Sequence, residues 1–403
     1  MRIRIVDPSA YTPPYDHALC SALAAAGDDV TLVTSAFPYG DVPRPDGYAV
    51  ERGFYRCSVG AAGSRVRQLS KAPQHPVDMW RVARSSRSAD VTHFQWLPLQ
   101  SVDLRLLGRR SPLPWRGPLV LTAHDVLPRE AAPGQRDAQR RLYARMDAVI
   151  VHSQHGRDRL VDDLGVPAAK VHLIPHGAFA HLTEIEPAPL PAELSAPVVV
   201  DSEATHSGVT GSVGARPAGG PGADAARPVV LLFGLLRPYK GLDVLLEAWR
   251  ALAAEGDPGA DLWVVGLPKY DVSTLRQTAP PSVRFVDRFV SDAETAAIFR
   301  RADVITLPYR EIDQSGVLFT ALAFGRPMVL SDVGGFPELA AEGAAELVPA
   351  GDAAALAARL RAVLDDRPRR EALAERAAAL AAGPYSWDAI AAAHQHVYAS
   401  LVG

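Results

Sequence analysis

Two cations stand three residues apart in the stretch FGLLRPYKGLDVLLEAW, where Arg237 and Lys240 follow an apolar run and precede an amphipathic segment. The apolar run predicts a buried strand that ends at Gly234, and Gly241 opens the predicted helix. Arginine offers a bidentate fork, lysine a mobile point charge, and a helix N-terminus a set of aligned N–H groups. The arrangement predicts a diphosphate-binding site. An exposed pair of charges without a ligand is the alternative.

A second candidate wall for this site lies in REIDQSGVLFTALAFGRP, residues 310–327. A loop here precedes a short apolar helix, and a glycine at its start lets a ligand approach the backbone N–H groups closely. Glutamine and serine side chains can hydrogen-bond hydroxyls, and a glutamate can accept from a diol. The predicted ligand-binding residues of this half are Gly234, Glu311, Gln314, Ser315, Gly316, Val317 and Thr320. An ordinary capped helix is the alternative.

The first half carries histidines at the ends of predicted strands. LVLTAHDVLPRE ends a strand at His124, which can bond a hydroxyl or orient a reacting group. Asp16 and His17 occupy the loop-to-helix junction in YTPPYDHAL, and His93 ends another strand. We predict that these residues contact a ligand, although a structural histidine is the commoner case. The HSQHG and IPHG stretches are predicted to shape turns near a hinge.

Apolar strands alternate with amphipathic helices through both halves of the chain. This alternation is typical of parallel sheets covered on both faces. Ser291 and Glu294 form a capping box at the start of one such helix. We therefore predict an α/β protein of two doubly wound, Rossmann-like domains facing across a cleft. Ligands of doubly wound sheets lie outside the carboxyl ends of the strands, so the site is expected between the two facing strand ends.

The boundaries follow from composition. Residues 181–227 are rich in Gly, Ala, Pro and Ser and have no period that could bury a face, which predicts a flexible linker or insertion. The flanking domains are then 1–180 and 228–383. The last segment, 384–403, is an amphipathic helix that either closes the second domain or crosses back to the first.

Whole-chain composition excludes several classes. A length of 403 residues favours two domains, and a net charge of −3 argues against a protein that binds nucleic acid. Two cysteines provide no disulfide framework, and no run of about 18 apolar residues or signal peptide is found, so a cytoplasmic location is expected. No GxxxxGK[ST] or GxGxxG loop and no metal-ligand spacing is present.

Charge is concentrated in one region. Residues 49–116 contain twelve Lys and Arg against four acidic residues. A solvated surface is one interpretation of this excess. The other is a face for anionic lipid headgroups or for an acidic ligand.

The order of TAHD, VIVHS, IPHG, GLLRPYKG, ADVITLPY and SGVLFTALAFGRPMVLSDVGGFPE resembles the retaining glycosyltransferases of family 4, which have the GT-B fold. The resemblance covers nearly the whole chain outside the linker. It implies a nucleotide-diphosphate sugar held by the C-terminal domain, an acceptor on the N-terminal one, and no metal or other cofactor. By position, Arg237 and Lys240 match the pair that binds the donor diphosphate, and His124 matches a histidine near the reacting carbon. His17 falls where the family carries a histidine on its first helix.

Two departures from the family pattern stand out. The family has two glutamates eight positions apart, and here Ile312 and Thr320 occupy those positions, with Glu311 one residue away. The DQSG stretch replaces the sugar contact, as in a bacterial subgroup with similar QSGV stretches. In the loop after the first strand, Pro13 and Pro14 replace the family's glycine pair.

The resemblance therefore implies a retaining hexosyltransferase with catalytic residues His124, Arg237 and Lys240. Its acceptor-binding residues would be Asp16, His17 and His93. A pseudo-glycosyltransferase or nucleotide-sugar epimerase on the same fold, and a non-catalytic nucleotide-binding protein, stay open. The acceptor is either lipid-linked or anionic, with peripheral contact at the inner face of the membrane, or a soluble natural product.

Overall fold

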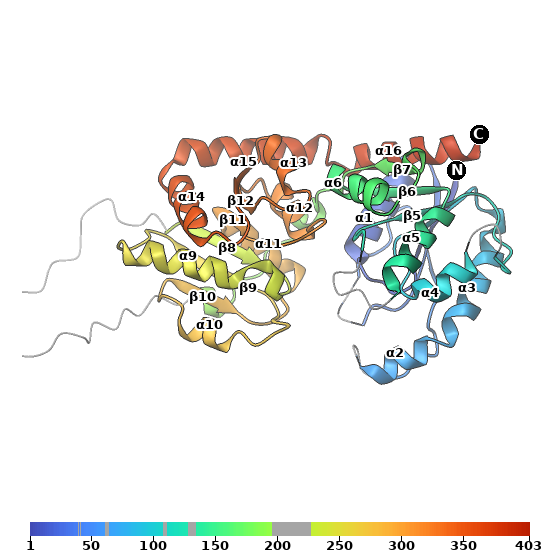
Figure 1. The fold of residues 1–403 in the computed structure, drawn as a ribbon, viewed down its shortest axis with the longest axis horizontal. Coiled ribbons are helices and arrows are strands. Elements are labelled where there is room, and N and C mark those ends of the chain that lie inside the picture. Colours follow the sequence, from blue (N-terminus) through green and yellow to red (C-terminus); the bar gives the residue numbers. More distant parts are fainter. Residues whose placement is uncertain (39, 41, 61–63, 108–110, 128–133, 196–226) are drawn as a thin grey trace, which may run out of the picture.

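The computed structural model describes residues 1–38, 40, 42–60, 64–107, 111–127, 134–195 and 227–403. They form two α/β domains side by side, each built on one parallel sheet (Figure 1). The predicted fold class is confirmed. The predicted linker residues 196–226 lie outside the described residues. Residues 181–195 hold two short helices, α7 (His181–Glu184) and α8 (Ala192–Ser195), which contact helix α11 and strand β10 of the second domain.

The first sheet has seven strands in the order β3-β2-β1-β4-β5-β6-β7. Its strands are β1 (Arg2–Asp7), β2 (Asp29–Thr34), β3 (Ala49–Arg52), β4 (Val91–Phe94), β5 (Leu119–Thr122), β6 (Ala148–Val151) and β7 (Val171–Leu173). Strands β4, β5 and β6 are buried at every position, as their continuous apolar runs predict. The strand order reverses between β1 and β4, so the expected ligand crevice lies at their carboxyl ends.

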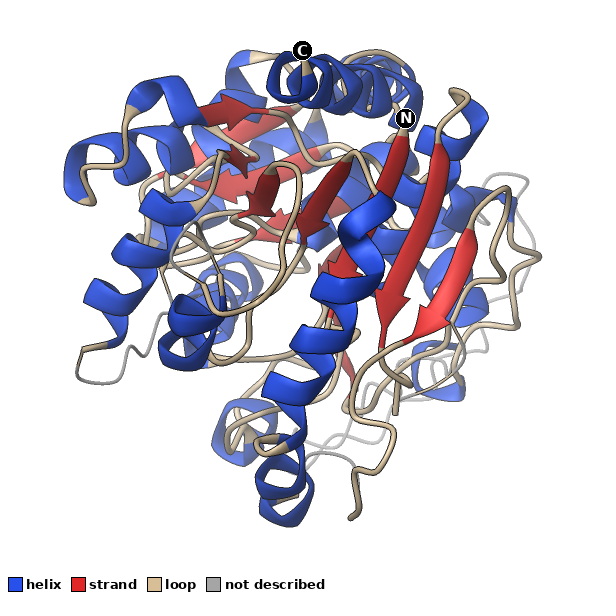
Figure 2. Ribbon diagram, turned by 90° about the vertical axis from the view of Figure 1, so that its right-hand side faces the viewer, coloured by secondary structure: helices blue, strands red, loops and turns tan. Residues whose placement is uncertain are grey.

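Helices lie in front of and behind these strands (Figure 2). They are α1 (Pro13–Ala25), α2 (Arg65–Lys71), α3 (Gln74–Ser85), α4 (Gln100–Leu106), α5 (Gln135–Arg145) and α6 (Gln154–Asp158), which a π-helical turn continues to 163. Helix α1 starts with two prolines, whose missing N–H groups cost nothing in a first turn. It therefore begins directly after the loop that leaves β1.

The second sheet has six strands in the order β10-β9-β8-β11-β12-β13. These are β8 (Val229–Phe233), β9 (Asp261–Val265), β10 (Val283–Val286), β11 (Val304–Leu307), β12 (Met328–Ser331) and β13 (Ala345–Val348). The main helices are α9 (Leu242–Ala254), α10 (Ser273–Gln277), α11 (Asp292–Arg301), α12 (Gly316–Ala323), α13 (Phe336–Ala341), α14 (Ala353–Asp365) and α15 (Arg367–Ala382). The capping box of Ser291 and Glu294 at α11 is confirmed.

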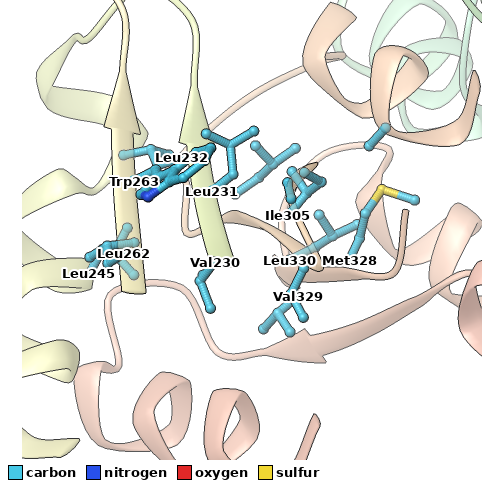
Figure 3. Packing of buried hydrophobic residues seen from close by; sticks show 14 of the residues in the cluster. Val230, Leu231, Leu232, Leu245, Leu262, Trp263, Ile305, Met328, Val329 and Leu330 are labelled. Atoms are coloured by element: carbon cyan, nitrogen blue, oxygen red, sulfur yellow. The ribbon is translucent and has the colours of Figure 1, made fainter. Parts of the chain in front are cut away.

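Buried aliphatic side chains hold the second sheet against its helices. Figure 3 shows Leu231, Leu232 and Trp263 from neighbouring strands packed beside Ile305 and Leu330. All are at most 3% exposed. Burying one such side chain contributes roughly 1.5–3 kcal/mol relative to leaving it in water. The strand ends that carry polar residues are therefore fixed by a continuous apolar layer beneath them.

Helix α16 (Trp387–Val402) leaves the second domain and packs on α1 of the first. Its apolar face joins the interior of the first domain, and Gln395 donates to Asp28 at 2.8 Å. The two chain termini consequently lie close together (Figures 1 and 2). No helix in the described part of the chain is long and apolar enough to cross a membrane.

The chain crosses between the domains twice, at neighbouring positions. The first crossing follows β7 and contains Ala178, and the second contains Tyr385 and Trp387 before α16. The N–H of Ala178 donates to the carbonyl of Tyr385 at 2.8 Å, and Trp387 Nε1 donates to the Ala178 carbonyl at 2.7 Å. His176 lies at this double crossing with its ring stacked on Phe319 of α12, at 4.3 Å between centroids.

The buried imidazole of His394 on α16 is expected to make the stability of the protein depend on pH. Burial lowers its pKa from 6.5 to about 4, and its Nδ1–H donates to Ile390 O at 2.8 Å. At a pH below 6.5, the pKa of this histidine in the unfolded chain, the unfolded chain binds a proton that the folded chain does not bind. The free energy of unfolding therefore decreases as the pH falls. In urea unfolding, we expect His394→Asn to gain about 2 kcal/mol relative to wild type between pH 8 and pH 5.

The matched control is His396→Asn, because His396 lies exposed on the same helix. Its stability curve should run parallel to that of the wild type. A His394→Asn curve parallel to wild type over this pH range would contradict the prediction.

Candidate active site

Lys240 is buried at the carboxyl end of the second sheet, next to the first turn of α12. It ends a 3₁₀ turn after β8, is only 7% exposed, and its Nζ lies 3.4 Å from the carbonyl of Phe233 and 5.2 Å from the centre of the Tyr309 ring. A Cβ at Gly234 would stand 2.9 Å from this Nζ and 3.2 Å from Val317 Cγ2. The glycine therefore leaves the space in which the ammonium reaches α12.

Arg237 lies on the same loop, three residues before Lys240. Its side chain is exposed and makes no hydrogen bond or ion pair with the residues that the structure describes. Its backbone is extended and precedes the 3₁₀ turn. The guanidinium is thus available to a ligand at the rim, while the ammonium of Lys240 is held in place below it.

Helix α12 presents its N-terminus at the strand ends. Ser315 is the N-cap residue with extended backbone, but its side chain makes no capping hydrogen bond. Its hydroxyl lies 3.5 Å from that of Tyr309 instead. The first N–H groups of a helix lack intrahelical partners and carry partial positive charge. Together with the nearby ammonium, the start of α12 forms an anion-binding corner.

The remaining predicted residues of this half differ in what they offer. Gln314 lies against Gly335, its Nε2 3.1 Å from where a Cβ there would be, and its Oε1 accepts from its neighbour's N–H at 3.3 Å. Glu311 is exposed and has no hydrogen bond within the described chain. Thr320 is buried, and its hydroxyl donates to Gly316 O at 3.1 Å. The Thr320 proton is therefore used inside the helix.

In the first domain, His124 lines a cavity of about 250 Å³ at the carboxyl ends of β4 and β5. Its ring stacks on Trp96 at 4.9 Å and lies edge-on to Tyr15 at 4.7 Å. Glutamines and aromatic side chains dominate the cavity wall, which contains Tyr11, Gln95, Trp96, Gln100, Gln135, Gln139 and Tyr143. Amides and ring faces of this kind suit a polyhydroxylated ligand.

A hydrogen-bonded relay fixes the tautomer of His124. His152 Nδ1 lies 3.0 Å from the carbonyl of Ile174, which can only accept, so His152 carries its proton there. His152 Nε2 must then accept from His124 Nδ1, 3.2 Å away. His124 Nε2 lies 3.0 Å from the amide of Gln95, whose Nε2 has no hydrogen-bond partner among the described residues. Turning that amide lets its Nε2 donate to Nε2 of a neutral His124.

Burial supports the neutral form. Loss of solvation, with a smaller contribution from neighbouring histidines, holds the pKa of His124 well below 6.5. The pKa of His152 falls to about 4 for the same reason. The site therefore presents uncharged imidazole on one wall and a buried cation on the other.

Asp16 and His17 lie at the start of α1 and line a different cavity, of about 330 Å³. Burial and the neighbouring Asp7 raise the pKa of Asp16 well above 3.8, and burial also raises the pKa of Asp7, which favours one proton shared between the two carboxyl groups. Asp7 also accepts from the N–H groups of Ser9 and Tyr11 at 3.1 and 2.5 Å. The amides of this loop are therefore bound by a side-chain carboxylate.

His93 is not brought to either cavity. It is fully buried, with Nδ1 2.6 Å from the hydroxyl of Tyr398 and Nε2 2.7 Å from that of Thr122. The structure thus places this predicted acceptor contact between the sheet and α16, because His93 lies inside β4, which ends at Phe94. The polar residues that follow the end of β4 are Gln95 and Trp96, and both line the cavity around His124.

Sequence reasoning missed the residues that join the two walls. Asp313, one residue before Gln314, and Glu338 on α13 both hydrogen-bond backbone groups of the first domain. Their only sequence signal is their position beside glycine-rich strand ends. Within the described residues, no group of three or more His, Cys, Asp or Glu side chains is placed to hold a metal ion.

Two family descriptions match the sequence. Residues 15–178 match Glycosyltransferase Family 4, and residues 227–366 match Glycosyl transferases group 1. Together they cover both domains and most of the chain.

Relatives in sequence include D-inositol 3-phosphate glycosyltransferase of Kineococcus radiotolerans, which is 28% identical over 72% of this chain and 67% of its own length. Phosphatidyl-myo-inositol mannosyltransferase of Mycolicibacterium smegmatis is 34% identical over 44% of this chain and 46% of its own length. The second alignment thus spans less than half of that relative.

Solved structures share the whole fold at low identity. Sucrose-phosphate synthase from Thermosynechococcus elongatus superposes with a TM-score of 0.72 at 20% identity, covering 100% of this chain and 99% of that one. Anabaena HepE in complex with UDP-glucose has a TM-score of 0.67 at 19% identity, with 100% of both chains covered. The fold and the matched residues of both domains agree: the chain belongs to the family 4 glycosyltransferases with the GT-B fold.

Proposed function

We propose that the protein transfers a hexosyl group from a nucleotide-diphosphate sugar to an acceptor hydroxyl with retention of the anomeric configuration. The observation that carries the proposal is the buried ammonium of Lys240 beside the N-terminus of α12. A buried cation next to uncapped helix N–H groups is matched by a diphosphate. The relatives named for transfer to inositol phosphate and to phosphatidyl-myo-inositol, and a neighbour bound to UDP-glucose, support this assignment.

In the proposed reaction, the bond between the anomeric carbon and the diphosphate oxygen breaks while the acceptor oxygen bonds to the same face of that carbon. Negative charge develops on the leaving diphosphate, where Lys240, Arg237 and the α12 amides stabilise it. The departing phosphate oxygen takes the acceptor proton, so no protein base is needed. Neutral His124 adds no positive charge beside the carbon, which itself becomes electron-poor.

The experiment is a panel of UDP-, GDP- and TDP-hexoses, with nucleotide release followed over time and the anomeric configuration of the product determined by NMR. We expect one donor to be consumed in the presence of an acceptor, with retention. We also expect EDTA to leave the rate unchanged, because the two side-chain cations neutralise the diphosphate.

Other products would identify the competing functions. A donor epimerised without transfer would indicate an epimerase. A donor that raises the melting temperature but is never consumed would indicate a nucleotide-binding protein without catalysis. An inverted product would contradict retention while leaving transfer intact.

For the acceptor, we propose an anionic or lipid-linked molecule reached from the cytoplasmic face of a membrane. Helices α2 and α3 lie at the lower right of the first domain in Figure 1 and carry exposed apolar side chains together with several cations. Leu69 on α2 and Trp80 on α3 are 75% and 45% exposed. The cations on these helices are Arg65, Arg67, Lys71, Arg81 and Arg84. Exposed apolar side chains between cations suit an anionic bilayer.

Co-sedimentation with phosphatidylglycerol vesicles tests this face. We expect wild-type protein to pellet with these vesicles and not with phosphatidylcholine vesicles. Leu69→Ser combined with Trp80→Ser should abolish pelleting and keep turnover on a soluble acceptor analogue. Equal pelleting of wild type and variant would contradict the membrane contact and favour a soluble acceptor.

A further inference from the structure

Asp313 belongs neither to the loop that carries Arg237 and Lys240 nor to the lining of the cavity around His124. It stands directly before Gln314 and Ser315, in the loop that leads from β11 into α12, and its side chain is 10% exposed. A buried carboxylate costs free energy unless hydrogen-bonded partners compensate its lost hydration. Its partners therefore show what the residue is for.

Those partners belong to the other domain. Asp313 Oδ2 accepts the backbone N–H of Val126 at 2.9 Å. Oδ1 forms an ion pair with the guanidinium of Arg159, and His155 Nε2 lies 3.8 Å from the same oxygen. Both carboxylate oxygens are thus directed at the first domain, from a loop of the second.

The Val126 contact acts on the segment that carries His124. Val126 follows His124 by two residues, and its carbonyl accepts the hydroxyl of Tyr143 on α5 at 2.8 Å. The carbonyl of Val126 thus binds its own domain, whereas the N–H of Val126 binds the second domain. A shift of Asp313 therefore moves the turn that positions His124.

A second interdomain contact lies elsewhere on the interface. Glu338 accepts the N–H groups of Gln154 and His155, at 2.8 and 3.0 Å, and so caps α6 from the second domain. This contact joins the domains without touching either Val126 or the loop before α12. Asp313 links the His124 turn directly to the N-terminal loop of α12.

We infer that Asp313 is a positioning residue for transfer: its paired carboxylate fixes the distance between His124 and the anion-binding start of α12. The inference rests on the proposed function, because those two places would hold the sugar and the leaving diphosphate. A displacement of about 1 Å between such groups is enough to lower a rate about 100-fold. Binding of the diphosphate needs only the second domain and is unaffected.

The test compares Asp313→Ala, Asp313→Asn and the control Asp243→Asn in the full-length protein. Asp243 pairs with Arg310 at 2.6 and 2.8 Å within the second domain and crosses no boundary. We expect kcat to fall about 100-fold in Asp313→Ala and about tenfold in Asp313→Asn, which keeps an acceptor for the Val126 N–H. The donor KM should change less than threefold, and Asp243→Asn should match the wild type.

A double variant tests the ion pair itself. Because Arg159 acts through Asp313, Arg159→Met combined with Asp313→Asn should lower kcat no further than Asp313→Asn alone. If the double variant instead lost the product of the two single-variant losses in kcat, Arg159 would act independently of Asp313 and the inference would be wrong. A raised donor KM at unchanged kcat in Asp313→Ala would also overturn it.

A measurement independent of catalysis separates this inference from the proposed function. The radius of gyration from small-angle scattering should increase in Asp313→Ala and stay at the wild-type value in Asp243→Asn. If wild-type protein consumes no nucleotide sugar and this difference is present, the proposed function fails and the positioning contact stands. If wild type is active and Asp313→Ala matches it in both rate and size, the inference fails alone.

Discussion

Lys240→Ala is expected to lower kcat by about 100- to 1,000-fold while leaving a folded protein, because removal of one preorganised donor to a developing negative charge has effects of that size. The ammonium is buried beside α12 and its position is set by the Phe233 carbonyl and the Tyr309 ring. The fold should survive, since the substitution removes a buried charge and leaves the apolar strands untouched. Nucleotide release and far-UV circular dichroism measure the two effects.

Two further variants separate charge from packing. Lys240→Met keeps the apolar stem and should be as inactive as the alanine variant. Lys240→Arg keeps a charge with a different shape and should recover part of the loss. Turnover within a few fold of wild type in a folded Lys240→Met protein would remove the phosphate role from this residue.

Gly241→Ala should reduce the stability of the second domain by about 3 kcal/mol. Gly241 has φ of +68°, and a Cβ there would lie 2.0 Å from the carbonyl oxygen of Pro308. The left-handed backbone accounts for about 1 kcal/mol, and the forced separation of two loops accounts for the rest. Those loops follow β8 and β11, so kcat should fall as well. The urea midpoint measures the loss of stability.

Gly259→Ala is the matched control, because Gly259 has φ of +69° with no atom within 4 Å of the added Cβ. It should lose only the backbone component, about 1 kcal/mol, and keep full activity. Equal losses for the two variants would show that the contact with Pro308 contributes nothing.

The strongest sequence signals concerned elements whose burial is set by local pattern. Continuous apolar runs predicted parallel strands, and the capping box at Ser291 predicted the start of α11, because both depend on neighbours in the sequence. Strand-end reasoning also predicted the site at the carboxyl edges, where Lys240 and the start of α12 meet.

Residues governed by distant partners were harder to interpret. His93 resembles a strand-end ligand in sequence, yet a hydroxyl 305 positions away, on Tyr398, holds it inside the fold. Asp313 resembles a loop residue, yet its partners lie 187 and 154 positions earlier. Asp7 binds the amides that a glycine-rich loop would offer to a phosphate. Such pairings depend on how domains pack, which no local pattern encodes.

The double crossing at Ala178 and Tyr385 limits how the enzyme can move. A single connecting segment would allow one domain both to rotate as a hinge and to twist about that segment. Two connecting segments that are hydrogen-bonded to each other resist this twisting. The domain motion that opens the cleft is then mainly a hinge rotation about the bonded pair. Each closure of the cleft then follows the same rotation and returns His124 and Lys240 to the same relative position.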